Sequence, residues 1–246
     1  MTENSQSSSH EGGGHFNTTA WTLVRAAGVD TSVGRQSLET LCRNYWSPLY
    51  VWLRRSGTQA SDAEDQLQGF FTHLIEHGVL SYADPARGRF RSFLIASLKQ
   101  FLAKEHHFQN AEKRRPAAGI VSLDTERVEA AFRLRGSAEE TAEQAFDRAW
   151  AMTVIEQVNS RLRDEFVSNG KGDLFDALSG TLTGQKELSG RELAERLHMT
   201  ESAVRVAAHR LRQRFGAMLR QEIAETVDRP DEVEDELLNL IRALKS

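Results

Sequence analysis

The sequence lacks the features of an exported or membrane-bound protein. Its single cysteine, Cys42, excludes an internal disulfide. No apolar run approaches the roughly 20 residues that a membrane-spanning helix needs. The Ser- and Gly-rich stretch 1–14 has no apolar core of the kind found in signal peptides. We therefore expect a cytoplasmic protein that has no membrane partner.

The signatures of nucleotide-binding enzymes and of β-sheets are also missing. The sequence contains neither a P-loop nor a dinucleotide-binding glycine motif. It has no alternating apolar and polar run bounded by turn residues, which is the pattern of a strand. Apolar residues instead recur at spacings of three and four along most of the 246 residues. This periodicity predicts an all-α protein, and we expect no catalytic site, cofactor or metal.

Charge is distributed unevenly along the chain. The net charge is −4, from 31 Lys and Arg residues and 35 Asp and Glu residues. Basic residues dominate 87–115 and 191–220, whereas acidic residues gather in 62–65, 139–143 and 231–236. Two basic islands in an acidic chain indicate two separate surfaces that face phosphate groups. Two solvated helix faces would give the same pattern, and charge by itself does not separate these interpretations.

The helical pattern divides the chain into two predicted domains. Residues 1–17 are polar and expected to be disordered. The first domain covers 18–115, and its first short helix is expected to begin near Thr18 or Thr19. Residues 116–140 have little sustained periodicity and are interpreted as a linker. The second domain covers 141–221, and an acidic helix, 222–246, follows it.

Local signals predict where several helices begin and end. Pro48 lies inside the apolar stripe of the first long helix and predicts a kink or a break there. Ser61, with Glu64 three residues later, has the form of a capping box for the next helix. The pair Asn169 and Gly170 is a predicted helix stop.

Residues 189–205 have the form of a helix-turn-helix. The first helix carries Leu193 and Ala194 on its inner face, and the small side chain of Ala194 lets a second helix cross closely. His198 occupies the turn position that usually needs a positive φ, which His tolerates better than most residues. Thr200 is a suitable N-cap for the second helix.

The second helix of this unit is amphipathic. Its apolar face holds Val204, Ala208, Leu211 and Phe215, and polar and basic side chains lie on the other sides. A recognition helix needs this arrangement to reach base edges and phosphates. The predicted DNA-reading residues are Ser202, Arg205, Val206, His209, Arg210, Arg212 and Gln213. A helical hairpin that binds protein is the alternative.

Four motifs in order resemble the extracytoplasmic-function (group IV) class of bacterial RNA polymerase sigma factors, in a planctomycete-type variant. They are YWSPLY (45–50), DAEDQLQGFF (62–71), GRFRSFL (88–94) and the helix-turn-helix ending in HRLR (209–212). The resemblance covers most of the chain, from Trp21 to Leu244. It implies a transcription initiation factor that has no enzymatic activity of its own.

The resemblance implies three surfaces. The helix at 62–71 matches the segment that docks on core RNA polymerase, with contacts from Asp62, Glu64, Asp65, Gln68 and Phe71. The helix at 90–107 and the basic stretch after it match the reader of the melted minus-ten strand, because aromatic and basic side chains suit flipped bases and phosphates. The implied minus-ten contacts are Arg91, Phe93, Lys99, Gln100, Lys104, His107, Lys113 and Arg114.

The helix-turn-helix matches the reader of the minus-thirty-five element. The implied partners are core RNA polymerase and promoter DNA, and an anti-sigma factor is a further candidate. The sequence departs from the family pattern at four positions: Gln66 and Gly69 replace Leu and Glu in the docking helix, and Gln100 and Lys104 replace Asn and Asp in the strand-separating helix. These departures leave the details of docking and strand separation open.

Two alternatives compete with this interpretation. A one-component DNA-binding regulator would need only the helix-turn-helix, but it leaves the docking motif unexplained. A metal-dependent hydrolase is suggested by the H-x-x-E-H pattern of His73, Glu76 and His77, which would also need a third ligand.

The acidic C-terminal segment is predicted to form an amphipathic helix. Its apolar stripe consists of Val233, Leu237, Leu240, Ile241 and Leu244. Acid at its start complements the helix dipole. We expect the stripe to pack on the DNA-binding domain or on the helix spanning 150–166. The alternative is autoinhibition, in which the acid covers the basic recognition face.

Overall fold

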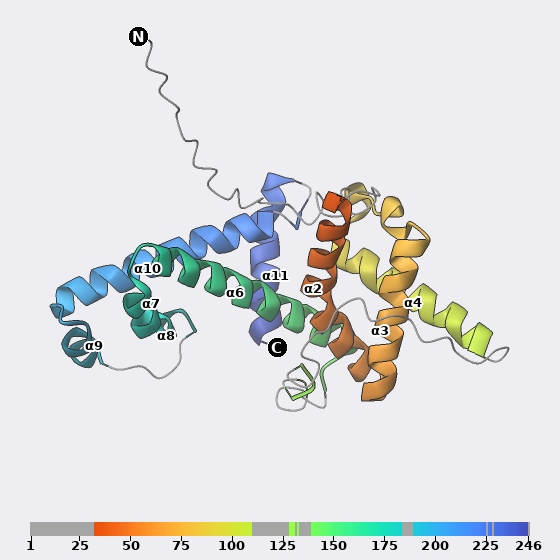
Figure 1. Ribbon diagram of the computed structural model, residues 1–246, viewed down its shortest axis with the longest axis horizontal. Coiled ribbons are helices and arrows are strands. Elements are labelled where there is room, and N and C mark those ends of the chain that lie inside the picture. The colour runs from red at the N-terminus through yellow and green to blue at the C-terminus, as the bar shows by residue number, and fades with distance from the viewer. Residues whose placement is uncertain are drawn as a thin grey trace, which may run out of the picture.

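The computed structural model describes residues 32–109, 128–130, 132, 139–183, 189–224, 226–227 and 229–245. All regular structure in these residues is helical, so the predicted all-α fold is confirmed. The helices form an elongated body, with α2, α3 and α4 at one end, α7, α8 and α9 at the other, and α6 and α10 running lengthwise (Figure 1). The expected disordered start and the helix near Thr18 lie outside the described residues.

The elements have the following bounds. The helices are α2 (Ser32–Arg55), α3 (Ala60–Glu76), α4 (Phe90–Gln109), α6 (Ala142–Ser168), α7 (Gly172–Leu178), α8 (Gly180–Thr183), α9 (Gly190–Leu197), α10 (Glu201–Ala224) and α11 (Val233–Lys245). Short 3-10 turns are η1 (Val79–Tyr82), η2 (Pro85–Arg87) and η3 (Pro230–Glu232).

A first hydrophobic cluster lies where α2, α3 and α4 meet the first half of α6. Its largest fully buried side chains include Tyr50, Phe70 and Phe90. Helix α3 approaches α4 closely at Gly69, where a Cβ atom would lie 3.2 Å from the Phe101 ring. Gly69, in the segment predicted to dock on polymerase, therefore allows close packing between these helices.

A second cluster joins the end of α6 to α7, α9 and α10. Leu162 of α6 packs there with Phe175, Leu178 and Leu211, all of which are buried. The same α6 contributes Trp150 to the first cluster, so one continuous helix carries core residues of both. The predicted domain boundaries stay a prediction, and α6 is the structural connection between the two packed groups.

Helix ends agree with some local signals and not with others. Helix α2 runs through Pro48 without a break, because the side chains on both sides of it, Trp46 and Leu49, are buried and hold the helix in place. The predicted cap at Ser61 is wrong, because α3 begins at Ala60 and Ser61 already lies inside it. The predicted stop at Gly170 is confirmed, since α6 ends at Ser168 and Gly170 has φ 66°.

Part of the predicted linker is anchored on α2. The carboxylate of Glu129 accepts hydrogen bonds from Tyr50 Oη and from Arg54 Nε and Nη2, each 2.8 Å long. The Arg54 guanidinium also lies 5.2 Å from the centre of the Phe132 ring. Burial raises the pKa of Tyr50 to about 12, and the bond to Glu129 adds to this rise.

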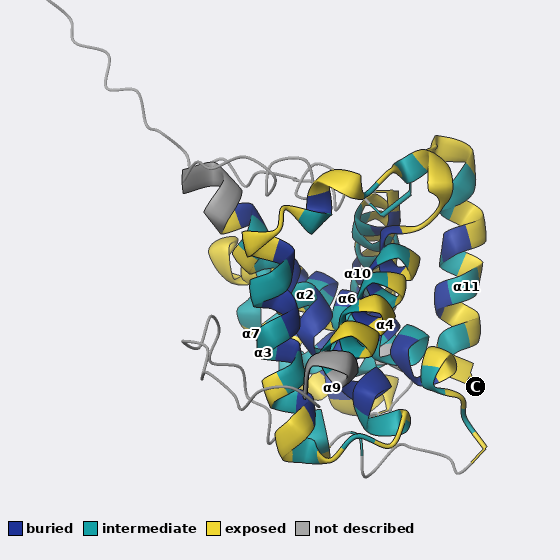
Figure 2. Cartoon of the chain, turned by 90° about the vertical axis from the view of Figure 1, so that its right-hand side faces the viewer, coloured by how far each residue is buried: buried dark blue, intermediate teal, exposed yellow. Residues whose placement is uncertain are grey.

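Helix α11 packs on α6 and on the C-terminal part of α10. Leu240 is 1% exposed, and Val233 and Leu237 are partly buried against the first cluster. Ile241 and Leu244, which the sequence assigned to the same stripe, are 38% and 40% exposed. Figure 2 shows α11 with a buried side and an exposed side. The packing on α6 confirms the first of the two expectations for this segment.

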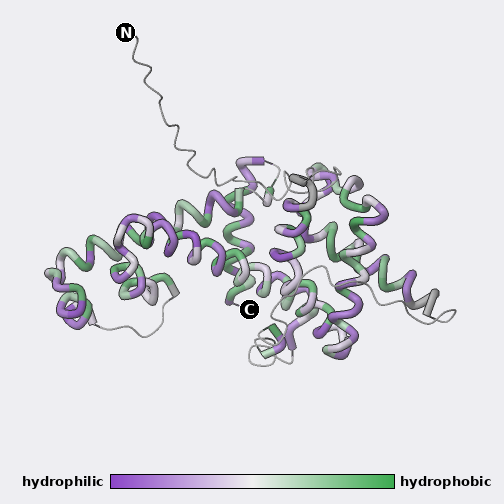
Figure 3. Tube along the Cα trace, viewed as in Figure 1, coloured by the Kyte–Doolittle hydropathy of each residue, from purple (hydrophilic) through white to green (hydrophobic). Residues whose placement is uncertain are grey.

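Hydrophilic and hydrophobic residues are interspersed along the helices (Figure 3). Among the described residues, we find no helix whose length and apolar content would let it cross a membrane.

The docking of α11 predicts unequal effects for two neighbouring leucines. Leu240→Ala should lower the free energy of unfolding by about 2–5 kcal/mol, because it leaves a cavity in the first cluster. Leu238→Ala removes the same atoms from a side chain that is 49% exposed and should change it by no more than about 0.5 kcal/mol. Urea denaturation measures both values. Equal effects of the two substitutions would show that α11 is not docked in this way.

Candidate nucleic-acid interface

Helices α9 and α10 are joined by a turn of three residues, His198 to Thr200. His198 has φ 52° and ψ 41°, which confirms the positive φ predicted there. Its N–H donates to the carbonyl of Glu195 (3.3 Å), and the Met199 N–H donates to that of Ala194 (2.9 Å). These two bonds form a Schellman motif, which ends α9 and fixes the direction of the chain.

Both helices of the unit begin at a capped residue. Thr200 Oγ1 accepts from the Ala203 N–H (3.2 Å), so Thr200 is the predicted N-cap. Ser189 and Glu192 form a capping box at the start of α9, with the Ser189 N–H donating to the Glu192 carboxylate (2.6 Å). These bonds from Ser189 lower the pKa of Glu192. The S-x-x-E pattern at this position is a readable signal that our sequence interpretation missed.

The inner side of α10 is anchored in the second cluster. Val204, Ala208 and Leu211 are buried there against Leu193 and Ala194 of α9. Small side chains at 194 and 208 let the two helices approach closely. The packing fixes which side of α10 is left for a ligand.

The opposite side of α10 carries every residue that the sequence predicted to read DNA. All seven are exposed: Ser202, Arg205, Val206, His209, Arg210, Arg212 and Gln213. Within the described part of the chain, the side chains of Arg205, Arg210 and Arg212 make no hydrogen bond or ion pair. Three cations without a protein partner are available to bind anions.

Neighbouring arginines on the same helix behave differently. Arg214 forms a forked pair with Glu165 of α6, with N–O distances from 2.7 to 3.1 Å. Arg220 pairs with Glu234 of α11 at 3.0 Å. The unpaired arginines therefore lie on one segment of α10, from 205 to 212.

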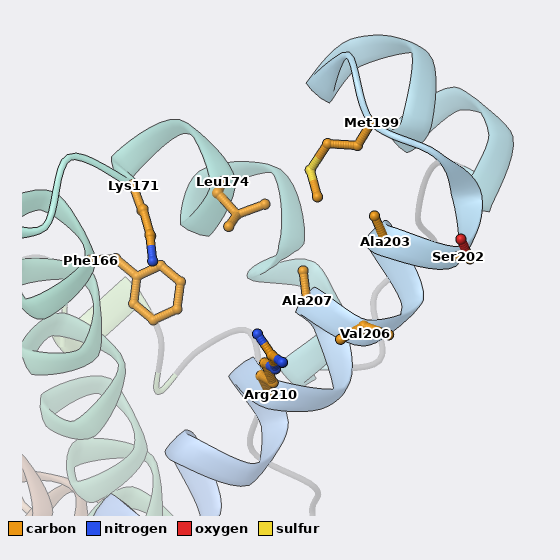
Figure 4. Close-up of a pocket in the computed structure, with 9 residues that line it drawn as sticks. All are labelled: Phe166, Lys171, Leu174, Met199, Ser202, Ala203, Val206, Ala207 and Arg210. Atoms are coloured by element: carbon orange, nitrogen blue, oxygen red, sulfur yellow. The ribbon is translucent and has the colours of Figure 1, made fainter.

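An apolar groove lies beside this segment, between α10 and the end of α6 with α7 (Figure 4). Its volume is about 470 Å³. Phe166, Leu174 and Met199 contribute to its apolar lining, and Lys171 and Arg210 supply its two basic side chains. Arg210 thus belongs both to the groove and to the exposed basic face.

The predicted minus-ten residues are not gathered into one exposed surface. Arg91 is buried, with Nε 3.0 Å from Asp147, its terminal nitrogens paired with Glu236, and its guanidinium 4.5 Å from the centre of the Trp150 ring. Burial lowers the pKa of Arg91, and Asp147 opposes that shift. A buried arginine cannot touch DNA in this conformation. The expectation that Arg91 contacts the minus-ten strand from the protein surface is therefore corrected. The reason is a tertiary contact from α11, distant in sequence.

The other residues of that group have mixed environments. Phe93 is half-buried against the first cluster, and Lys99 pairs with Glu143 at 2.9 Å. This hydrogen bond lowers the pKa of Glu143. Gln100 and Lys104 are exposed. The side chain of His107, and Lys113 and Arg114 entirely, lie outside the described residues.

The predicted polymerase-binding residues divide between surface and core. Asp62 and Asp65 are exposed, and Glu64 and Gln68 are half-buried. Phe71 is 3% exposed and stacks on Trp46, with ring centres 5.8 Å apart. The expected contact from Phe71 is therefore corrected, because it lies on the same inner face of α3 as the other buried side chains.

The H-x-x-E-H pattern places two imidazoles together at the end of α3. The rings of His73 and His77 lie 4.4 Å apart. Burial lowers the pKa of His73, and the neighbouring His77 adds to this shift. In the parts of the chain that the structure describes, no group of three or more His, Cys, Asp or Glu side chains could hold a metal ion. The third ligand that a hydrolase would require has not been located there.

Comparison with known proteins gives no match: no protein-family model, no curated protein and no solved structure is significantly similar to this chain.

The turn predicts an effect of glycine at position 198. A left-handed conformation costs a side-chain-bearing residue about 1–2 kcal/mol, so His198→Gly should raise the free energy of unfolding by up to about 1 kcal/mol after the entropy cost of glycine. His198→Val should lower it, because a β-branched residue tolerates positive φ poorly. Urea denaturation tests both substitutions. A destabilised glycine variant would contradict the turn conformation.

Proposed function

We propose that the protein is a sigma-type transcription initiation factor, which binds core RNA polymerase and reads promoter DNA without catalysing a reaction itself. The observation that supports this most is the exposed side of α10, where the seven predicted reading residues include three unpaired arginines. As part of the proposal, α9 and α10 form a helix-turn-helix, and the protein acts in the cytoplasm.

The geometry of α10 suits the major groove. Arg205, His209 and Arg212 recur at spacings of four and three, so they share one side of the helix. The major groove is about 12 Å wide and admits an α-helix. Arginines at its edges can bind phosphates or guanine edges, while the apolar side of α10 stays fixed in the second cluster.

The polymerase contact is proposed for the start of α3. Asp62 and Asp65 are exposed in the first turns of that helix, opposite its buried face. An acidic surface of this kind fits a basic partner surface. Helix α3 and the start of α10 lie toward opposite ends of the molecule (Figure 1), so polymerase and DNA could be bound at the same time.

A one-component regulator that does not bind polymerase is the second candidate, since the exposed face of α10 would serve it equally well. The discriminating property is affinity for core polymerase.

DNA reading is tested by comparing arginines on one helix. Arg205→Ala and Arg210→Ala should each weaken duplex binding by roughly 1–3 kcal/mol where the side chain reads a base. An arginine that contacts only phosphate should instead weaken all sequences alike and lower the salt slope by about 0.9. Arg214→Ala is the matched control, because Arg214 already pairs with Glu165. Fluorescence anisotropy measures the affinities. An equal effect of all three substitutions would count against a recognition role for this face.

Polymerase docking is tested by charge reversal. Asp62→Lys with Asp65→Lys should weaken binding to core RNA polymerase about tenfold or more, because like charges then oppose each other across the interface. Asp164→Lys with Asp173→Lys, at exposed positions of α6 and α7, is the control for the same change in net charge. Titration with labelled core polymerase gives the affinities. Strong duplex binding with no polymerase binding in the unaltered protein would favour the one-component regulator.

A further inference from the structure

Two charged residues are buried in the described part of the chain, and they are paired with each other: Arg91 at the start of α4 and Glu236 in the first turn of α11. They are 7% and 1% exposed, respectively. A buried ion pair is costly to desolvate, and apolar residues of similar size often stabilise a fold as well. The pair therefore invites a functional explanation beyond packing.

Glu236 is held by two arginines at once. Arg89 Nε lies 2.8 Å from Glu236 Oε2, and both terminal nitrogens of Arg91 pair with the same carboxylate, Nη2 at 3.4 Å from Oε2. Asn239 donates a further hydrogen bond to Oε2 (3.3 Å). Two guanidinium groups that converge on one carboxylate form an anion-binding site, and the same geometry accepts a phosphate.

The arginine side of this site does not depend on α11 for its orientation. Asp147 of α6 binds Arg91 at Nε (3.0 Å), and the Trp150 ring supports its guanidinium from α6. If α11 moved away, these contacts would still direct the terminal nitrogens of Arg91 toward the position of the carboxylate. Arg89 is already 42% exposed at its side chain. The site would then be open and preorganised for an anion.

Helix α11 is held by few other buried groups. Leu240 is its one fully buried apolar side chain among the residues described. Val233 and Leu237 are partly buried, and Leu238, Ile241 and Leu244 are exposed. The other acids of its first turn, Glu234 and Asp235, are exposed too. Glu236 is thus a principal attachment of a short helix, and a competing anion could displace it.

We propose that Arg89 and Arg91 form a binding site for a DNA phosphate, and that Glu236 of α11 occupies this site in the free protein. The inference rests on the proposed function and adds its regulation. A DNA strand cannot bind at this site while α11 is docked, because both use the guanidinium groups of Arg89 and Arg91. Eight residues connect α10 to α11, so a displaced α11 stays at high effective concentration and closes the site again when DNA leaves. The acid covers the predicted minus-ten element rather than the recognition face of α10.

The test compares two glutamates of α11. Glu236→Gln keeps the shape of the side chain and removes its charge, while Glu234→Gln does the same at an exposed position that pairs with Arg220. The probe is fluorescein-labelled single-stranded DNA of random sequence. Glu236→Gln should bind it several-fold more tightly, and its log–log salt slope should steepen by about 1.4 for two freed cations at about 0.7 each. Glu234→Gln should leave both values unchanged, and adding Arg91→Ala to Glu236→Gln should remove the gain.

Glu236→Ala in the full-length chain removes the carboxylate altogether and should also gain affinity for the single strand. Unchanged or weaker binding by both Glu236→Gln and Glu236→Ala would overturn the proposal and leave the ion pair a packing feature. Duplex binding that depends on Arg205 is measured in parallel. If it persists while single-strand binding shows no gain, the regulation fails and the proposed function stands. If no variant binds duplex DNA, the proposed function fails, and this inference fails with it.

Discussion

The packing of α6 holds the rest of the molecule in place. This helix of 27 residues is about 40 Å long and carries Phe146, Trp150 and Val154 into the first cluster and Leu162 into the second. Helices α2, α7, α10 and α11 all pack against it. Because the exposed side of α10 and the acidic start of α3 are both fixed relative to α6, its packing determines where the two proposed binding surfaces lie. Trp150 and Asp147 of the same helix also orient Arg91.

The arginines fall into two groups, those paired with a carboxylate and those without such a partner, and the net charge of the chain does not reveal this difference. Arg161, Arg163 and Arg214 are each paired with a carboxylate from another helix, and pairs near the surface contribute little to stability. Arginines 205, 210 and 212 have no such partner in the described chain. In a protein of net charge −4, an unneutralised basic segment on one helix produces a local positive field, which attracts a polyanion. This contrast supports the proposed recognition role of α10.

Sequence predicted the features that depend on neighbouring residues. The positive φ of His198, the cap at Thr200 and the stop at Gly170 all follow from local backbone chemistry, and the structure has each of them. The buried and exposed sides of α10 follow from helical periodicity. The burial of Arg91 could not be predicted in this way, because its partner Glu236 lies 145 residues away in sequence. The charge pattern by itself indicates that both residues lie on the surface. The anchoring of Glu129 on α2 escaped prediction for the same reason, since it depends on contacts made 75 or more residues away.

The central claim is that this chain directs a polymerase to promoters, and in vitro transcription tests it most directly. Core RNA polymerase is mixed with a library of promoter fragments, with and without the purified protein, and the transcripts are sequenced. The account predicts transcripts from a defined subset of fragments that share two sequence elements, appearing only when the protein is present and lost with Arg205→Ala and Arg210→Ala together. Transcription that is the same with and without the protein, while the protein still binds duplex DNA, would contradict it.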